Sequence, residues 1–267
     1  MKGSRTLSVA VKIGAGFGLV IVLLIVVGAV GFFALRGAEL DFEKYEDTAQ
    51  QNDLAASIRS NMVGVEVVTL KYIQTSNPEE LKRYEERYGK ARELIEEAQQ
   101  TMDAPKRAAA IDRIQEEVER YGEGFERVRR LVDERDAVQA TLDEVGPRII
   151  PALTEFLNRA DANNQTEVVV LTALLRRDIL RARLQVFRYL NNNDPTLIDD
   201  ADEVFAEFRR NVEKIEAQVK DDAVVSSELA SIVKDVDEYQ KNVAELRHAV
   251  EARNDIVSNT LDVVGLA

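Results

Sequence analysis

Apolar residues recur at steps of three and four along nearly the whole chain after residue 36. This spacing places them on one face of an α-helix and therefore predicts an all-α fold. Turns are expected at Ser76-Asn77-Pro78 and Asn193-Asp194-Pro195, because a short polar residue before a proline suits the start of a helix. The predicted helices cover residues 36–75, 78–102, 105–159 and 165–190, a fifth that ends near 220, and 227–267.

The third and sixth helices are expected to be long. A bend is predicted in the third at Gly146-Pro147 and again near Pro151, because proline removes a backbone hydrogen-bond donor. The sixth is expected to continue to the end of the chain. Glycines are scarce after residue 37, which argues against a sheet protein with its many tight turns.

Residues 13–35 form an apolar stretch of 23 residues without a charge. As a helix it would span about 34 Å, enough for a hydrocarbon core of about 30 Å. It is longer than the apolar part of a cleaved signal peptide, which favours an uncleaved anchor. Lys2, Arg5 and Lys12 precede it and acidic residues follow Arg36. The short N-terminus is therefore predicted to be cytoplasmic and the rest of the chain to lie outside.

The sequence contains an internal duplication. An offset of 117 residues matches residues 54–78 to 171–195, an offset of 118 matches 118–135 to 236–253, and an offset of 119 matches 141–146 to 260–265. Each copy consists of a helix, a turn, a second helix and the first part of a long helix. Two single-residue insertions over this length indicate a true duplication.

The duplication predicts an N-terminal transmembrane helix followed by two stacked four-helix bundles that share two long helices. Residues 1–12 would be the cytoplasmic N-terminus, 13–35 the anchor, 36–135 the membrane-proximal module and 136–267 the membrane-distal module. Completing the first module requires the sixth helix to continue beyond Ala267. We therefore expect the sequence to be a fragment that lacks a second transmembrane helix and an output domain.

Composition limits the chemistry that the chain can perform. It has no cysteine and a single histidine, His248, so the common catalytic and metal-binding constellations are poorly supplied and we expect no enzyme activity, cofactor or metal. From residue 36 onward 32 basic residues face 48 acidic ones, a net charge of −16. A nucleic acid would be repelled by this charge.

Two arginines interrupt the apolar seams at matching places in the two copies. The seam of the third helix steps through Val128 and Val132 to Arg135, and the seam of the sixth steps through Val250 to Arg253. A buried charge needs a partner, so each guanidinium is expected to meet a carboxylate, contributed by the protein or by a ligand. The protein alternative is an ion pair with Glu134 or Asp136, or exposure where the modules meet. The ligand alternative rests on the planar fork of arginine, which suits a carboxylate.

A second group of candidate ligand-binding residues lies on the fourth helix. Arg176 and Arg183 are seven residues apart, on a face predicted to include Ile179 and Phe187. The counterpart of Arg176 in the first helix is Arg59. Local positive charge of this kind would attract an anion to an acidic domain. The alternative for each is an arginine on the flank of the bundle whose head group reaches water.

A basic N-terminus, an apolar helix, about 230 helical residues and the repeated Thr141-Leu142-Asp143-Glu144-Val145-Gly146 and Thr260-Leu261-Asp262-Val263-Val264-Gly265 resemble the helical bimodular sensor domain of bacterial methyl-accepting chemotaxis proteins. The second copy departs from the first in having Leu266 where the first has Pro147. The resemblance implies a periplasmic sensor that is anchored in the bacterial inner membrane, binds a small carboxylate and forms a homodimer. Two alternatives stay open: a membrane-tethered helical scaffold without a ligand, and the sensor of a histidine kinase or cyclic-dinucleotide enzyme.

Overall fold

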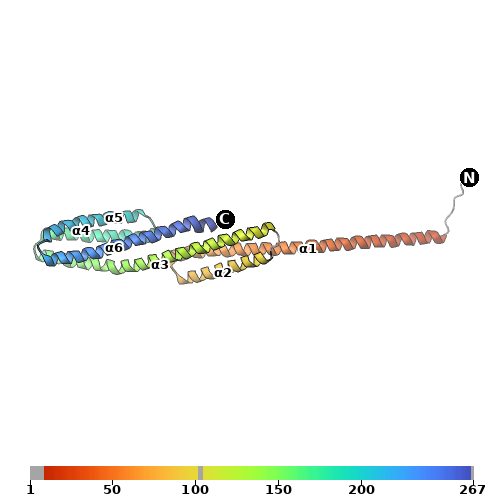
Figure 1. Cartoon of the computed structure of the whole chain (residues 1–267), viewed down its shortest axis with the longest axis horizontal. Helices are drawn as coiled ribbons and strands as arrows, with labels where there is room; N and C mark the ends of the chain where they lie inside the picture. The colour runs from red at the N-terminus through yellow and green to blue at the C-terminus, as the bar shows by residue number, and fades with distance from the viewer. Residues whose placement is uncertain (1–8, 102–104, 266–267) are drawn as a thin grey trace. The chain divides into compact units, whose positions relative to one another are not determined.

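The computed structural model describes residues 9–101 and 105–265, apart from the side chains of residues 9–21 and of a few residues between 38 and 47. Helices joined by short turns make up this part of the chain, and it contains no strand (Figure 1). The elements are α1 (Val9–Thr75), α2 (Pro78–Thr101), α3 (Pro105–Ala162), α4 (Thr166–Asn192), α5 (Thr196–Val219), α6 (Ala223–Ile256), the π-helical turn η1 (Val257–Leu261) and α7 (Asp262–Gly265). The all-helical prediction is confirmed.

The predicted membrane anchor at residues 13–35 falls within α1, and it stays a prediction. The side chains of residues 13–21 lie outside the described residues. From Val22 to Leu35 the large apolar side chains are exposed. A search of the described residues for a helix with the length and apolar character needed to cross a membrane found none.

The chain divides into two compact units. The first consists of Met1–Asn61 and Lys90–Asp112, and the second of Met62–Gly89 and Arg113–Ala267. Helices α1, α2 and α3 therefore contribute to both units, whereas α4 to α7 belong to the second. The predicted boundary between residues 135 and 136 stays a prediction. Both hydrophobic clusters described next lie in the second unit.

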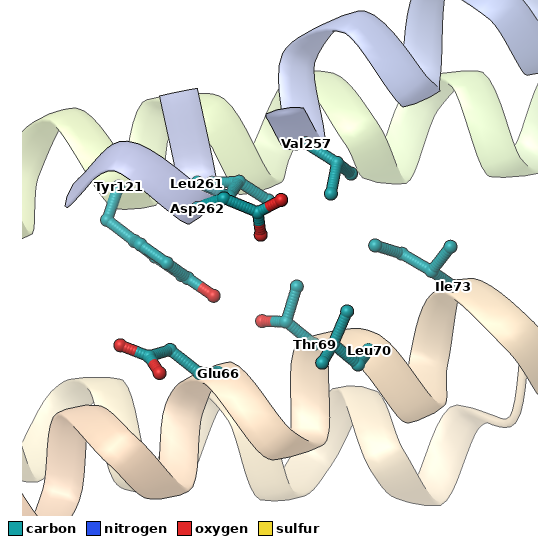
Figure 2. Close-up of a pocket in the computed structure, with 8 residues that line it drawn as sticks. All are labelled: Glu66, Thr69, Leu70, Ile73, Tyr121, Val257, Leu261 and Asp262. Carbon is teal, nitrogen blue, oxygen red and sulfur yellow. The ribbon is translucent and has the colours of Figure 1, made fainter. Parts of the chain in front are cut away.

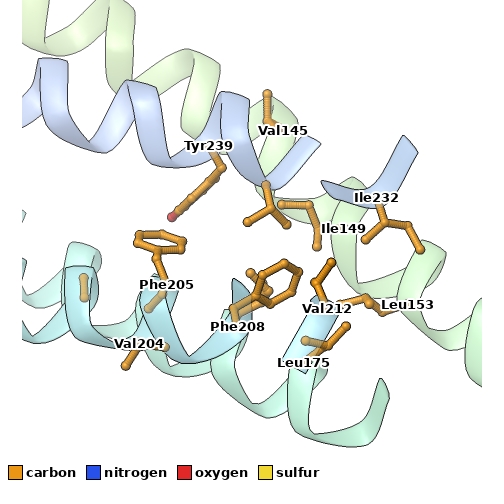
Figure 3. Close-up of a cluster of buried hydrophobic side chains, with 14 of the residues drawn as sticks. Val145, Ile149, Leu153, Leu175, Val204, Phe205, Phe208, Val212, Ile232 and Tyr239 are labelled. Atoms are coloured by element: carbon orange, nitrogen blue, oxygen red, sulfur yellow. The ribbon is translucent and has the colours of Figure 1, made fainter. Parts of the chain in front are cut away.

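The larger hydrophobic cluster gathers the inward faces of α3, α4, α5 and α6. Figure 3 shows Phe205 and Phe208 of α5 within it, together with Ile149 of α3 and Tyr239 of α6. The rings of Phe205 and Tyr239 have centroids 6.3 Å apart. Four helices around one apolar core make a four-helix bundle, in which burial of apolar surface is the main stabilising contribution.

A smaller cluster joins α1, α2 and α3 to the C-terminal segment. Phe125 of α3 is its centre: the Tyr84 ring stacks on it at 3.6 Å between centroids, and the Tyr72 ring lies at 5.8 Å. Ile256 at the end of α6 and Leu261 of η1 complete the cluster. The two clusters therefore share α3 and α6.

Helix α3 runs through Pro147 and Pro151 as one helix, so the predicted bends do not divide it. The predicted start of the sixth helix at residue 227 is wrong, because α6 already begins at Ala223. Asp222 is its N-cap, and its side chain accepts hydrogen bonds from Val224 N and Val225 N, both at 3.1 Å. Sequence analysis had overlooked this capping aspartate.

The predicted sixth helix contains a π-helical turn that was not predicted, because η1 lies between α6 and α7. The N–H of Asp262 donates to the carbonyl of Val257, five residues earlier, as in a π-helix. The offset between the copies rises from 118 to 119 between Arg253 and Thr260. The second copy thus has one residue more than the first in this stretch, and the wider π turn accommodates it without breaking the helix.

Replacing Asp222 with alanine should lower the free energy of unfolding by about 1 kcal/mol, because it removes the side-chain acceptor at the start of α6. Urea unfolding of the variant and the wild-type chain measures the difference. Asp221→Ala changes an exposed neighbour that is not the cap and should have little effect. Equal losses in the two variants would show that the cap contributes nothing.

Candidate functional site

Arg135 is held by groups of the protein itself. Its side chain is 14% exposed and forms an ion pair with Asp136, in which Nε donates to Oδ1 at 2.8 Å. Its Nη2 donates to Ser76 Oγ at 2.5 Å, and Nη1 donates to the carbonyl of Ile73 at 3.3 Å. The ion pair with Asp136 considered from the sequence is therefore present, and the guanidinium also holds the end of α1.

Arg253 is more deeply buried, and its partners carry no charge. It is 4% exposed, and its Nε and Nη2 donate to Asn254 Oδ1 at 3.1 and 2.7 Å. Nη2 also donates to Asn193 Oδ1 at 3.1 Å. Burial lowers the pKa of Arg253, the charge of Arg135 lowers it further, and Tyr189 acts in the opposite direction. Among the described residues no carboxylate forms an ion pair with this buried cation.

The two arginines occupy the same place in the duplicated structure. Ser76 and Asn193, which correspond at the offset of 117, both have positive φ values, 50° and 53°. Each donates its backbone N–H at 2.8 Å to a tyrosine carbonyl at the end of the preceding helix. Each copy thus fastens its turn to the seam arginine. The copies differ in the residue after the arginine, which is Asp136 in the first and Asn254 in the second.

A cavity of about 320 Å³ adjoins Arg253, because Asn193 and Asn254 line it. Its two acidic residues already have partners. Glu251 pairs with Arg247 at 2.8 Å, and Asp255 accepts from Asn259 at 2.5 Å. A carboxylate in this cavity could replace the amide oxygens as acceptor for the guanidinium, with stronger, charge-assisted hydrogen bonds.

The other predicted site residues lie in different surroundings. Arg176 is half-buried, and its Nε is buried without a hydrogen-bond partner. Arg183 is half-buried beside Tyr239. Burial raises the pKa of this tyrosine to about 12, and the charge of Arg183 and a hydrogen bond with it partly oppose that rise. Arg59 is exposed and belongs to the first compact unit, whereas the four other arginines belong to the second. Of the five, Arg135 and Arg253 are the pair that act on each other through their charges.

The apolar face predicted on α4 is wrong in one member, because Phe187 is 65% exposed. The buried face of α4 instead includes Leu175, Ile179 and Val186. Arg176 and Arg183 therefore flank the core rather than project into it. The predicted seams of α3 and α6 are confirmed, since each apolar residue leading to Arg135 and Arg253 is buried.

Asp178 is a buried carboxylate that sequence analysis missed. Its Oδ1 accepts from Arg177 Nε at 2.8 Å and from Nη2 at 2.6 Å, while its buried Oδ2 has no hydrogen-bond partner. Burial raises the pKa of this carboxyl, and Arg177 partly opposes that effect. The sequence indicates the burial of Asp178 only through helical spacing, because Asp178 follows Leu175 of the buried face of α4 by three residues.

The free energy of unfolding should depend less on pH when Asp178 is replaced by asparagine. Burial raises the folded-state pKa above the unfolded value of about 3.9, so the folded state holds the proton more tightly. This contribution is fully present below the unfolded pKa and is lost as pH rises through the folded pKa. Urea unfolding between about pH 4 and pH 7 should show a smaller change in the free energy of unfolding for Asp178→Asn than for the wild type. The exposed control Asp161→Asn should keep the wild-type profile, and an unchanged profile in Asp178→Asn would contradict the prediction.

A second cavity, of about 270 Å³, lies between α1, α3 and the η1–α7 segment (Figure 2). Its polar groups are Glu66 and Thr69 of α1, Tyr121 of α3 and Asp262 of α7. Burial raises the pKa of Glu66, and the charge of Asp262 raises it further. Burial also raises the pKa of Tyr121 to about 12, against the smaller opposite effect of the nearby Thr69 hydroxyl. None of these four residues was predicted as a site residue, although a comparison of the two copies of the duplication could have drawn attention to them.

Helices that pack around shared apolar seams place the described part of the chain in the class of helical bundles. A sequence model of one such family, the four-helix-bundle sensory module for signal transduction, matches residues 6–148. The match covers more than half of the chain, so the chain belongs to this family. It is a family of sensory modules of chemoreceptor-type signalling rather than of enzymes. No curated protein matches the chain.

Proposed function

We propose that the chain is the extracytoplasmic sensor region of a bacterial chemoreceptor, that it recognises a small organic acid, and that it is anchored in the cell membrane by residues 13–35. The observation that carries this proposal is the buried guanidinium of Arg253, whose partners are amide oxygens alone. Arg135 adds a second positive charge nearby. Because a buried cation without a counter-ion is costly, a ligand carboxylate would gain strongly by neutralising it.

The proposed subtype is the helical bimodular sensor, with two stacked four-helix bundles. The duplication supports it, as do the two hydrophobic clusters that share α3 and α6. The arginine site lies where the turn between α4 and α5 meets α6. A ligand that binds there would favour one arrangement of these helices, and a small helix shift is the usual form of such a signal.

Thermal unfolding of the full chain with acetate, succinate, malate and citrate tests the proposal. A cognate acid at a hundred times its dissociation constant should stabilise the folded state by about 2.7 kcal/mol. Arg253→Met should abolish that stabilisation, because methionine keeps the length of the side chain without its charge. Arg148→Met removes an exposed arginine and is the matched control.

Two outcomes would contradict the proposal. The first is that no acid changes the unfolding temperature, which would favour a tethered scaffold. The second is an acid whose effect survives in Arg253→Met, which would place the ligand elsewhere. Loss of the effect in Arg148→Met as well would show that general surface charge, not the buried arginine, is responsible.

A homodimer is part of the proposal, and an exposed apolar stripe supports it. The stripe occurs in both copies at the offset of 117 residues: Val63, Val67 and Leu70 on α1, and Leu180, Leu184 and Phe187 on α4. These side chains are 48–65% exposed, and contiguous apolar surface of this kind usually marks an interface. Sedimentation of the full chain should show a dimer that Val67→Glu or Leu184→Glu dissociates. A monomer at all concentrations would contradict this part of the proposal.

A further inference from the structure

The cavity between α1, α3 and the η1–α7 segment has an acidic wall. Two carboxylates, Glu66 and Asp262, line it, and no basic residue is among its lining residues. Figure 2 shows these two groups and the hydroxyls of Tyr121 and Thr69 around a common space. Leu70, Ile73, Val257 and Leu261 form the apolar remainder of the wall. An anion would be repelled here, whereas a cation would relieve the repulsion between the two carboxylates.

Thr69 provides independent support for a ligand. It is 2% exposed, and its buried Oγ1 has no hydrogen-bond partner. Figure 2 shows this oxygen on the side of Thr69 that is turned toward the Tyr121 hydroxyl, at the edge of the space enclosed by the lining residues. A buried hydroxyl without a partner costs free energy, and such groups in folded proteins call for an explanation. A hydrogen-bond donor that occupies the cavity would satisfy it.

The second copy of the duplication shows what such a donor could be. Glu66, Tyr121 and Asp262 correspond to Arg183, Tyr239 and Asp143 at the offsets of 117, 118 and 119. Burial raises the pKa of Tyr239 to about 12; the charge of Arg183 and a hydrogen bond with it oppose this rise, and the charge of Asp143 adds to it. A Cβ on Gly146 would lie 3.0 Å from Arg183 Nε and 3.1 Å from the Tyr239 ring, so these groups pack together there. The equivalent place in the larger bundle, where Arg183 and Tyr239 of the second copy meet Asp143 of the first, therefore contains its own cation.

The cavity beside Glu66 has an acid in place of this internal cation. It has the equivalent tyrosine, Tyr121 of the first copy, and the equivalent aspartate, Asp262 of the second, but Glu66 where the larger bundle has Arg183. We propose that this cavity binds a small protonated amine, with its ammonium group between Glu66 and Asp262. The three N–H donors of a primary ammonium suit two carboxylates and the Thr69 hydroxyl. The apolar wall would hold a short hydrocarbon chain, as the volume of about 270 Å³ allows.

Calorimetric titration of the full chain with butylammonium tests the proposal. Butanol and butyrate have the same chain length without the positive charge, and calcium supplies positive charge without the chain. We expect butylammonium to bind and the three other probes to bind at least about tenfold more weakly, since a hydrogen bond to a charged group corresponds to about 10- to 100-fold in affinity. Equal affinity for butanol, or tighter binding of butyrate or calcium, would overturn the proposal.

Substitutions locate the site and separate binding from folding. Glu66→Gln and Asp262→Asn should each weaken butylammonium binding by about 10- to 100-fold, while Glu134→Gln, an exposed acid on α3, should not. Glu66→Arg introduces into the first copy the residue type that the second copy has at the equivalent position, Arg183. It should abolish amine binding and raise the unfolding temperature without ligand. Unchanged binding in Glu66→Gln, or amine binding retained in Glu66→Arg, would overturn the proposal even if one variant failed to fold.

Discussion

Replacing Phe208 with alanine is expected to lower the free energy of unfolding by about 3–5 kcal/mol. The side chain is 1% exposed and lies within the cluster in Figure 3, where α3, α4, α5 and α6 converge. Truncation to alanine loses the transfer free energy of the ring and leaves a void that these rigid helices can fill only in part. Urea unfolding measures the change, and a shift in midpoint with an unchanged slope would assign it to stability.

Val224→Ala is the surface control for this experiment. Val224 is 64% exposed in the first turn of α6, so the change should stay within about 0.5 kcal/mol. A loss below about 1 kcal/mol in Phe208→Ala would contradict the packing of four helices around this residue. Comparable losses in the two variants would do the same.

Helix positions and the core were predictable because their signals are local and periodic. The end of α1 at Thr75 and the start of α2 at Pro78 follow from the turn chemistry around Asn77. The side chain of Asn77 caps α2 by accepting a hydrogen bond from Glu79 N at 3.0 Å. The seams through Val132 and Val250 follow from helical spacing alone. The start of α6 was predicted too late, at residue 227, because Asp222 was not recognised as the N-cap.

The candidate sites were less predictable, because they depend on contacts between distant segments. Sequence spacing placed Arg135 and Arg253 in the seams, but it did not show that one has a carboxylate partner and the other has amides. The cavity beside Glu66 needs α1, α3 and α7 together. The exchange of Glu66 for Arg183 was nevertheless present in the aligned copies and could have been noticed as a reversal of charge at one position.

The duplication also explains why η1 lies where it does. One extra residue in the second copy between Arg253 and Thr260 would rotate everything after it by about 100° on a regular α-helix. The π turn absorbs that residue, so that Leu261 remains buried and Asp262 reaches the cavity. π turns of this kind occur frequently at functional sites. The insertion therefore keeps the C-terminal segment in register with α1 and α3.

Arg253→Met is expected to leave the ligand-free chain at least as stable as the wild type, and more stable by up to about 4 kcal/mol. The wild-type protein keeps a guanidinium 4% exposed, with a lowered pKa and amide partners alone. Methionine fills much of the same space without a charge to desolvate. A gain in stability that accompanies loss of acid binding would show that the buried charge is retained at a cost to folding, as is common at functional sites.

Arg135→Met provides the matched comparison, because it alters the corresponding residue of the other copy. It should lower the free energy of unfolding by about 1–3 kcal/mol, since Asp136, Ser76 and the carbonyl of Ile73 all lose a donor. Opposite signs in the two variants, measured by urea unfolding without ligand, are the expected result. If Arg253→Met were destabilising to the same extent, the amides of Asn193 and Asn254 would already compensate the charge. The buried cation would then gain little from an additional anion, and the physical basis for acid recognition at this site would be lost.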